Sequence, residues 1–201
     1  MKFGRIQPNP RFAEFQKIVA AHPEWLSAWS GTFFRFQSID FPAPKDVLSG
    51  SGARERGGRW NLPGLATVYG STTDDTALEE CKANDRYYGI ETKSPRLLVA
   101  IEARLVGVID LTSPAIRRTL GVTLPELAAE DWRKLLNAGR ESSSQALGRA
   151  GAVAGASGLL VRSATIPRGV NLAVFPGAHP NDRITVVEGD KLARLGVRRW
   201  T

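Results

Sequence analysis

Residues 67–88 read TVYGSTTDDTALEECKANDRYY, and this stretch sets the order of the predicted elements. Thr67–Ser71 is β-prone and predicts a short strand. Asp74–Tyr88 predicts a helix, with Ser71 or Thr73 as its N-cap. Because the strand runs almost directly into the helix, the end of the strand and the first turns of the helix must lie close together in space.

Strand and helix signals alternate through the rest of the chain, but long crossover helices are few. This pattern predicts an α+β fold: a single domain with a mixed, largely antiparallel sheet and flanking helices, not a doubly wound nucleotide-binding fold. Pro42–Gly64 is rich in Gly, Pro and Ser and predicts one long loop. The other predicted elements are a helical segment over Asn9–Trp29 broken near Pro23, a strand at Thr32–Gln37, one or two strands over Arg96–Leu111 with a bend at Gly107, helices at Leu124–Asn137 and Ser142–Ala156, and strands at Gly158–Arg162, Val170–Phe175 and Arg183–Glu188.

The composition is that of one globular domain. The chain has 201 residues, of which 42% are hydrophobic and 23% charged, and its formal net charge is +7. No apolar run approaches the roughly 18 to 20 residues that cross a bilayer. The N-terminus lacks the apolar segment of a secretory signal, so we expect a cytoplasmic protein without a membrane span. The basic excess is modest and no nucleic-acid-binding motif accompanies it, so nucleic acid is not the expected main ligand.

The sequence also argues against a metal site. Cys81 is the only cysteine, which excludes an internal disulfide and a cysteine-based zinc site. His22 and His179 have no cluster of acidic residues around them. We therefore expect no metal cofactor.

Residues 52–61, GARERGGRWN, have the composition of a phosphate-binding loop. Glycine lets the backbone approach an anion closely, and the guanidinium groups of Arg54, Arg56 and Arg59 can bind phosphate oxygens in pairs. Trp60 offers an aromatic face beside them. The same composition also fits a solvated turn, and the residues alone leave both interpretations open.

Two adjacent glutamates of the predicted helix point in different directions. At about 100° per residue, Glu79 points away from the apolar face and Glu80 lies at its border. The apolar face consists of Ala77, Leu78, Cys81 and Tyr88. A half-buried carboxylate beside a phosphate-binding loop is a candidate catalytic group, and an ordinary surface charge is the alternative.

Several of these segments, in this order, resemble the RES-domain family. The family comprises toxins of toxin–antitoxin pairs, and the resemblance covers about residues 31–190. Two segments depart from the family pattern, because VRSA replaces the commoner Val-Pro-Ser and FPGAHP replaces an Asn-Pro pair. The motifs that carry the resemblance are FFRF at 33–36, GGRWNLPG at 57–64, YGS at 69–71, ALEE at 77–80, SSSQALG at 142–148, GLLVRSA at 158–164, Asn171, and FPGAHP at 175–180.

The resemblance implies a fold similar to bacterial ADP-ribosyltransferase toxins, with residues 31–201 as the RES domain and 1–30 as an N-terminal helical extension. It implies an enzyme that takes NAD as its substrate, needs no metal and releases nicotinamide by hydrolysis or phosphorolysis. The alternative on the same scaffold is transfer of ADP-ribose to a protein. The implied partner is an Xre-like antitoxin with a helix-turn-helix. Apart from the resemblance, apolar residues of the N-terminal helix could form a surface for a homodimer or for the antitoxin, although core packing is expected for most of them.

The resemblance also assigns roles to individual residues. Glu80 is expected to stabilise the positive charge that develops on ribose when the glycosidic bond breaks. Ser163 is expected to orient Arg35 or an oxygen of ribose or phosphate. The expected catalytic residues are Glu80, Tyr69 and Arg35, and the expected NAD-binding residues are Arg35, Arg54, Arg59, Trp60, Asn61, Tyr69 and Ser163.

Overall fold

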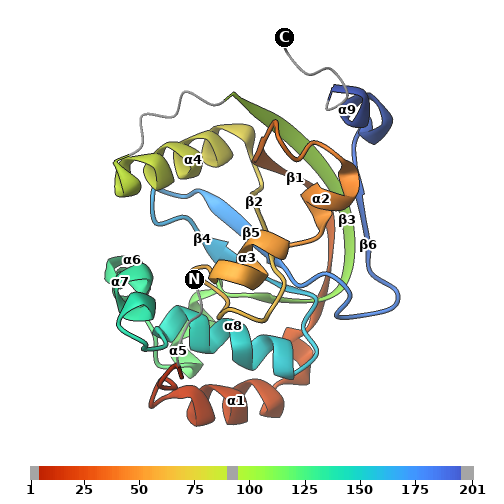
Figure 1. Ribbon diagram of the computed structural model, residues 1–201. Helices are drawn as coiled ribbons and strands as arrows, with labels where there is room; N and C mark the ends of the chain where they lie inside the picture. The colour runs from red at the N-terminus through yellow and green to blue at the C-terminus, as the bar shows by residue number, and fades with distance from the viewer. Residues whose placement is uncertain (1–4, 90–94, 196–201) are drawn as a thin grey trace.

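The computed structural model describes residues 5–89 and 95–195. Its strands form one curled sheet with helices packed around it (Figure 1). The strands are β1 (Ser27–Ser38), β2 (Val68–Ser71), β3 (Arg96–Asp110), β4 (Gly158–Arg162), β5 (Val170–Val174) and β6 (Arg183–Val186). The helices are α1 (Phe12–Ala21), a 3-10 turn (Pro23–Trp25), α2 (Pro44–Leu48), α3 (Ser51–Arg56), α4 (Asp74–Tyr88), α5 (Pro114–Thr119), α6 (Leu124–Ala129), α7 (Trp132–Asn137), α8 (Ser143–Val153) and α9 (Gly189–Leu195).

The sheet closes on itself through its longest strand. The strand order is β1-β2-β5-β4-β3-β6, and β1 also pairs with β3. β3 pairs with β1 along one edge and with β6 and then β4 along the other. Among the described strands only β3 and β4 run parallel, and every other pair is antiparallel. These findings confirm the predicted α+β fold with a mixed, largely antiparallel sheet and flanking helices.

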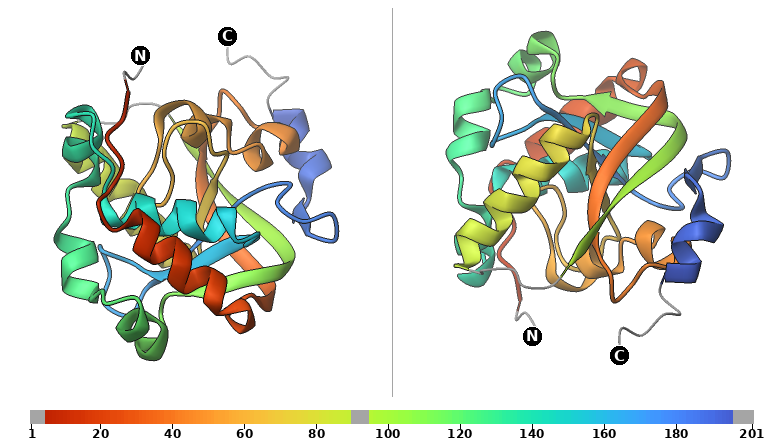
Figure 2. Two further views of the ribbon diagram at one scale, coloured as in Figure 1. Left: turned by 90° about the horizontal axis from the view of Figure 1, so that it is seen from below. Right: turned by 90° about the horizontal axis from the view of Figure 1, so that it is seen from above.

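Two hydrophobic cores lie on the two faces of this sheet. The inner core fills the curl of the sheet, with Val47 of α2 packed against it. The outer core joins β4 and β5 to α1 and α8, which lie side by side in Figure 1 and in the left view of Figure 2. The inner core is built mainly from Phe33, Val68, Val99, Ile101, Ala103, Leu105, Leu172 and Val174. The outer core is built mainly from Phe15, Val19, Trp60, Ala146, Leu147, Ala150, Leu159, Val161 and Ala173.

The N-terminal segment shares the outer core. The predicted helix over Asn9–Trp29 is confirmed over α1, and α1 ends just before the predicted break near Pro23. The helix prediction is wrong from Ser27 onward. There the chain already forms β1, because its pairing with β3 overrides the local helical spacing. The expected boundary between residues 30 and 31 therefore falls inside a strand. Phe15 and Val19 of α1 are buried against α8, so they are not exposed for a homodimer.

Other corrections concern short helices. The predicted loop Pro42–Gly64 contains α2 and α3, which are too short to show a helical period. The predicted helix Leu124–Asn137 is divided into α6 and α7, because Asp131 caps a new helix by accepting a hydrogen bond from the Lys134 amide. The sequence also did not predict α5 and α9. No helix of the described ranges is long and apolar enough to cross a membrane.

The helix at the centre of the sequence prediction has the predicted bounds. Thr73 caps α4 by accepting a hydrogen bond from the Thr76 amide at 3.2 Å. Gly89 ends the helix in the left-handed region at φ 60°, where glycine is favoured over residues with a side chain. Figure 2 shows α4 lying across the outside of the sheet near β1.

Gly148 on α8 generates a stability prediction. A Cβ atom at this position would lie 1.7 Å from the Trp60 carbonyl oxygen, a clash with backbone that no rotamer can relieve. We expect Gly148→Ala to lower the free energy of unfolding by about 3 kcal/mol or more. The matched control is Gly151→Ala on the same helix, whose Cβ would meet only side-chain atoms at 3.2 Å or more. Thermal unfolding of both variants is followed by circular dichroism. Equal melting temperatures would contradict the close contact between Gly148 and the Trp60 backbone.

Candidate active site

The carboxylate of Glu80 lies at the centre of a polar cluster on the outer face of the sheet. Its Oε1 atom accepts hydrogen bonds from Ser163 Oγ and from Asn171 Nδ2, both at 2.7 Å. Ser71 Oγ in turn donates to Asn171 Oδ1 at 2.7 Å. Helix α4, the end of β4, the start of β5 and the end of β2 therefore meet at one carboxylate.

Strand register brings these polar groups together. Asn171 is paired with Ser71 of β2 on one side and with Val161 of β4 on the other. Ser163 follows two residues after Val161, so it points to the same face of the strand. The sequence placed Ser71 and Asn171 within motifs but assigned neither to the site.

Ser163 is held so that its hydroxyl proton points at Glu80. Its Oγ accepts hydrogen bonds from the amides of Thr165 and Ile166, each at 3.0 Å. With its acceptor side occupied, the hydroxyl is left with its single donor, which goes to Glu80 Oε1. The expected contact of Ser163 with Arg35 is not among the hydrogen bonds of the described residues, and the hydroxyl orients the glutamate instead.

Glu79 and Glu80 point in different directions, as predicted, although Leu78 and Tyr88 of the predicted apolar face are exposed. Glu79 faces outward, where Lys82 Nζ donates to its Oε1 at 2.7 Å and lowers the pKa of the carboxyl. Glu80 is half-buried, and its Oε2 accepts no hydrogen bond from the residues that the structure describes. One oxygen of Glu80 is thus fixed by the protein while the other is free to interact with a ligand.

The hydroxyl of Tyr69 organises the neighbouring loop. It donates to Asn61 Oδ1 at 2.7 Å and accepts from the Trp60 amide at 2.9 Å. Burial raises the pKa of Tyr69, so the phenol is neutral at physiological pH. Its hydroxyl is fully engaged within the protein.

The side chains of Asn61 and Trp60 are more deeply buried than we expected from their motif. The Asn61 amide is fully buried and donates to the carbonyl oxygens of Ala53, Leu62 and Leu65 at 2.9 to 3.0 Å. Trp60 is 5% exposed and belongs to the outer core. Direct contact of either side chain with NAD, as expected from the sequence, does not fit this burial, and both shape the loop that carries Arg59.

Arg59 lies beside the cluster with part of its guanidinium free. Its Nη1 donates to the carbonyl oxygens of Leu127 at 2.7 Å and Glu130 at 3.4 Å. Its Nε and Nη2 atoms donate to no described residue and are not buried. Burial of the side chain and the nearby charge of Arg133 lower the pKa of Arg59, and the charge of Glu80 opposes this effect.

The structure places Arg35 apart from Glu80. Phe34 of β1 pairs with Ser71, so Arg35 points to the other face of the sheet, where Nη1 donates to the Val47 carbonyl at 3.1 Å. Its Nε is buried without a partner, and burial lowers the pKa of the guanidinium to about 10. Arg54 is exposed on α3.

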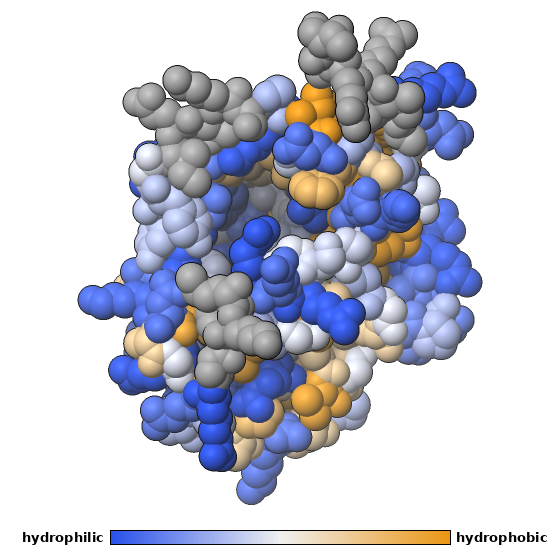
Figure 3. Space-filling view, in the orientation of Figure 1, coloured by the Kyte–Doolittle hydropathy of each residue, from blue (hydrophilic) through white to orange (hydrophobic). Residues whose placement is uncertain are grey.

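On the face seen in Figure 3, the surface is hollowed between the region of α4, the helix that carries Glu80, and that of α2 and α3. No group of three or more His, Cys, Asp or Glu side chains suited to a metal ion occurs in the described ranges. The site thus offers one carboxylate, several hydroxyl and amide groups, and at least one partly free guanidinium.

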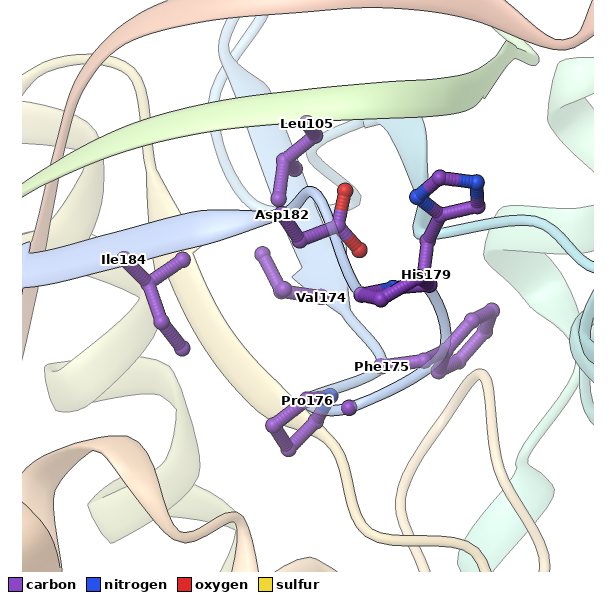
Figure 4. A pocket seen from close by; sticks show the side chains of 9 residues that line it. Leu105, Val174, Phe175, Pro176, His179, Asp182 and Ile184 are labelled. Atoms are coloured by element: carbon purple, nitrogen blue, oxygen red, sulfur yellow. The ribbon is translucent and has the colours of Figure 1, made fainter.

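A separate pocket of about 290 Å³ lies on the far side of β5 (Figure 4). Its only acidic side chain, Asp182, accepts hydrogen bonds through Oδ1 from the Val106 amide and Ser157 Oγ, both at 2.9 Å. None of the expected site residues lines it, so it is distinct from the Glu80 cluster. The lining residues are Leu105, Val174, Phe175, Pro176, Gly177, His179, Pro180, Asp182 and Ile184.

Comparisons with known proteins match nearly the whole fold. A family model described as RES domain matches residues 33–193. The NAD(+) phosphorylase MbcT of Mycobacterium bovis and that of Mycobacterium tuberculosis are each 31% identical to this chain over 153 residues. The match covers 73% of this chain and 73% of each relative. The crystal structure of the M. tuberculosis MbcT–MbcA toxin–antitoxin complex contains a chain with a similar fold, at a TM-score of 0.67 and 22% identity. The alignment covers 92% of this chain and 97% of that one.

The contacts of Asn61 generate a second stability prediction. Removing its amide takes one donor away from each of three carbonyl oxygens and takes the acceptor away from the Tyr69 hydroxyl. Asn61→Ala should therefore lower the free energy of unfolding by roughly 2 to 4 kcal/mol. Arg54→Ala changes an exposed side chain a few residues away and should leave stability within about 0.5 kcal/mol. Urea unfolding measures both. Equal midpoints for the two variants would show that Asn61 does not organise the loop.

Proposed function

This chain belongs to the RES domain family, and we propose that it is an enzyme that degrades NAD by cleaving the bond between nicotinamide and ribose. The observation that carries the proposal is the half-buried Glu80, fixed through one oxygen by Ser163 and Asn171 and free at the other. The relatives named NAD(+) phosphorylase support the choice of substrate and bond.

Glycosidic cleavage needs a negative charge at a defined place. The bond from ribose C1′ to the nicotinamide nitrogen breaks with its electron pair on nicotinamide, and the ribose is left as an oxocarbenium-like cation. A carboxylate that is already oriented stabilises this cation without reorganising during the reaction. Glu80 Oε2 is the atom assigned to this role, and it can also accept a hydrogen bond from a ribose hydroxyl. Water or inorganic phosphate then adds to C1′ and loses a proton.

The arginines are assigned to the phosphates of NAD. Arg59 presents Nε and Nη2 beside Glu80, and a guanidinium can bind two phosphate oxygens at once. Arg35 is kept in the proposal because its buried charge has no carboxylate partner within 4 Å among the described residues. An uncompensated buried cation is costly, and a bound anion would relieve that cost. Arg54, on the exposed surface, contributes long-range attraction.

Tyr69 and Ser163 act indirectly in this proposal: Tyr69 positions the loop that carries Arg59, and Ser163 positions Glu80. The Tyr69 ring supports the segment that carries Arg59, and its hydroxyl holds that segment through Asn61 and the Trp60 amide. Ser163 fixes the orientation of Glu80. Both are therefore positioning residues in this proposal.

An enzyme that consumes cytoplasmic NAD would harm the cell that makes it, so we propose that this chain is a toxin held inactive by an antitoxin. The solved complex with a similar fold is a toxin–antitoxin pair, which supports this type of partner. The antitoxin in this proposal belongs to the Xre-like class. An acidic segment of the antitoxin would be attracted to the exposed arginines of α3 near the site.

Glu80→Gln tests the catalytic assignment. Glutamine keeps the shape and the two accepted hydrogen bonds of Glu80 but removes the charge, so NAD cleavage should fall by on the order of 10²-fold or more while stability changes little. Glu79→Gln, the outward-facing neighbour, should retain activity close to that of the wild type. Nicotinamide release is measured by chromatography. The ribose product is identified by mass as ADP-ribose, its phosphate ester or a modified protein, which separates hydrolysis, phosphorolysis and protein ADP-ribosylation.

Similar activities for the two glutamate variants would contradict the assignment of Glu80 as the catalytic carboxylate. Absence of nicotinamide release by the wild-type chain, with and without added phosphate, would contradict the proposed function itself.

Expression in bacteria tests the toxin assignment. The wild-type chain should arrest growth and deplete cellular NAD, because the reaction consumes the pool directly. Glu80→Gln should permit growth, and co-expression of the antitoxin encoded beside the gene should restore both growth and NAD. Growth arrest by the Glu80→Gln variant with NAD intact would show that any toxicity has another origin.

A further inference from the structure

Arg133 has an unusual environment near the Glu80 cluster. Its guanidinium lies over the rings of Trp132, Tyr87 and Tyr88, at 4.4, 4.5 and 5.5 Å from their centroids. Its Nη2 donates to Asn84 Oδ1 at 2.8 Å. Its Nε is buried and has no hydrogen-bond partner, whereas Nη1 donates to no described residue and is not buried. The aromatic rings and Asn84 hold the guanidinium in place but leave two of its nitrogens without an acceptor.

The contact with Asn84 places Arg133 on the catalytic side of α4. Asn84 follows Glu80 by four residues, so the two side chains lie on one face of the helix with Cβ atoms about 6 Å apart. Arg59 approaches the same region from the loop after α3, and its Nη1 is bound to carbonyl groups of the segment that leads into α7. Arg59 and Arg133 therefore flank Glu80 from the side of α6 and α7, the two helices beside α4 at the left of Figure 1.

Glu80, Glu130 and Asp131 act on the two arginines only at longer range. Neither forms an ion pair with a carboxylate within 4 Å in the part of the chain that the structure describes. Glu130, the nearby candidate, uses its carboxylate to accept hydrogen bonds from the amides of Ser143 and Ser144 at the start of α8. Asp131 accepts from the Lys134 amide and the Tyr87 hydroxyl. Burial and the charge of Arg133 lower the pKa of Arg59, and the charges of Glu80 and Glu130 oppose this effect, so the two guanidinium groups lie near each other and near Glu80.

We propose that Arg133 joins Arg59 in binding phosphate oxygens of the ligand beside Glu80. The inference rests on the proposed function, which supplies two sources of such oxygens: the pyrophosphate of NAD and an inorganic phosphate that attacks ribose. Both offer oxygens to the free N–H groups of a preorganised guanidinium pair. No motif in the sequence marks Arg133, because the residue reaches the site through side-chain contacts with Asn84 and Tyr87 of α4.

Binding measurements on the Glu80→Gln chain test the proposal without turnover. Calorimetry is carried out with NAD and, separately, with inorganic phosphate, on Glu80→Gln and on the double variant Glu80→Gln/Arg133→Gln. We expect the second substitution to weaken binding of at least one probe by on the order of tenfold. Weaker NAD binding identifies the pyrophosphate as the source, and weaker binding of phosphate alone identifies the acceptor. Arg133→Lys keeps the charge but loses the planar guanidinium, so in the Glu80→Gln background it should weaken binding less than Arg133→Gln does.

Lys134→Gln in the same background is the matched control, because it removes one positive charge from the exposed side of α7. It should change both affinities by less than twofold. Affinities of the Arg133→Gln and Arg133→Lys variants within twofold of the control, for both probes, would overturn the proposal. The result is separate from that of the proposed function, which fails only if the wild-type chain releases no nicotinamide.

Discussion

The hydrogen bonds that fix Glu80 Oε1 are the constraint on which the site depends. The donors are Ser163, which directly follows β4, and Asn171 of the adjacent strand β5, and the acceptor comes from a helix far earlier in the chain. This geometry requires the β2–β5–β4 register to be correct to the residue, since a shift of one position would turn Asn171 to the other face. The closed sheet secures the register by pairing β1 and β3 around the inner core. Fold stability and catalytic geometry are thus coupled through the strand pairing.

The loop between α3 and β2 is the second part of the same arrangement. Asn61 and the Tyr69 hydroxyl satisfy its buried backbone groups, and Gln145 of α8 donates to the Gly58 carbonyl at 3.0 Å. Trp60 anchors the loop in the outer core, where Gly148 allows close contact with its backbone. These contacts hold Arg59 near Glu80 without using the side chain of Arg59 itself. The glycine- and arginine-rich composition therefore combines a structural role, in Asn61 and Trp60, with one arginine that remains partly free for a ligand.

Local interactions explain which features could be predicted from the sequence. Helix α4 and the different directions of Glu79 and Glu80 follow from local patterns, and the structure agrees with them. Thr73, one of two candidates for the N-cap, is the residue that caps the helix. The strand at Ser27 and the contact of Arg133 with Asn84 depend on partners distant in the chain, which no local pattern encodes. Motif composition also could not separate residues that bind a ligand from residues that build the loop. Asn61 and Trp60 belong to the motif of Arg59, and only their burial distinguishes them.

Cleavage of NAD at the free oxygen of Glu80 can be tested with a crystal structure of the Glu80→Gln chain bound to NAD. We expect the nicotinamide ribose within hydrogen-bond distance of the side chain of residue 80 and the pyrophosphate on the guanidinium of Arg59. NAD bound with its ribose away from residue 80, for example in the pocket beside Asp182, would contradict it.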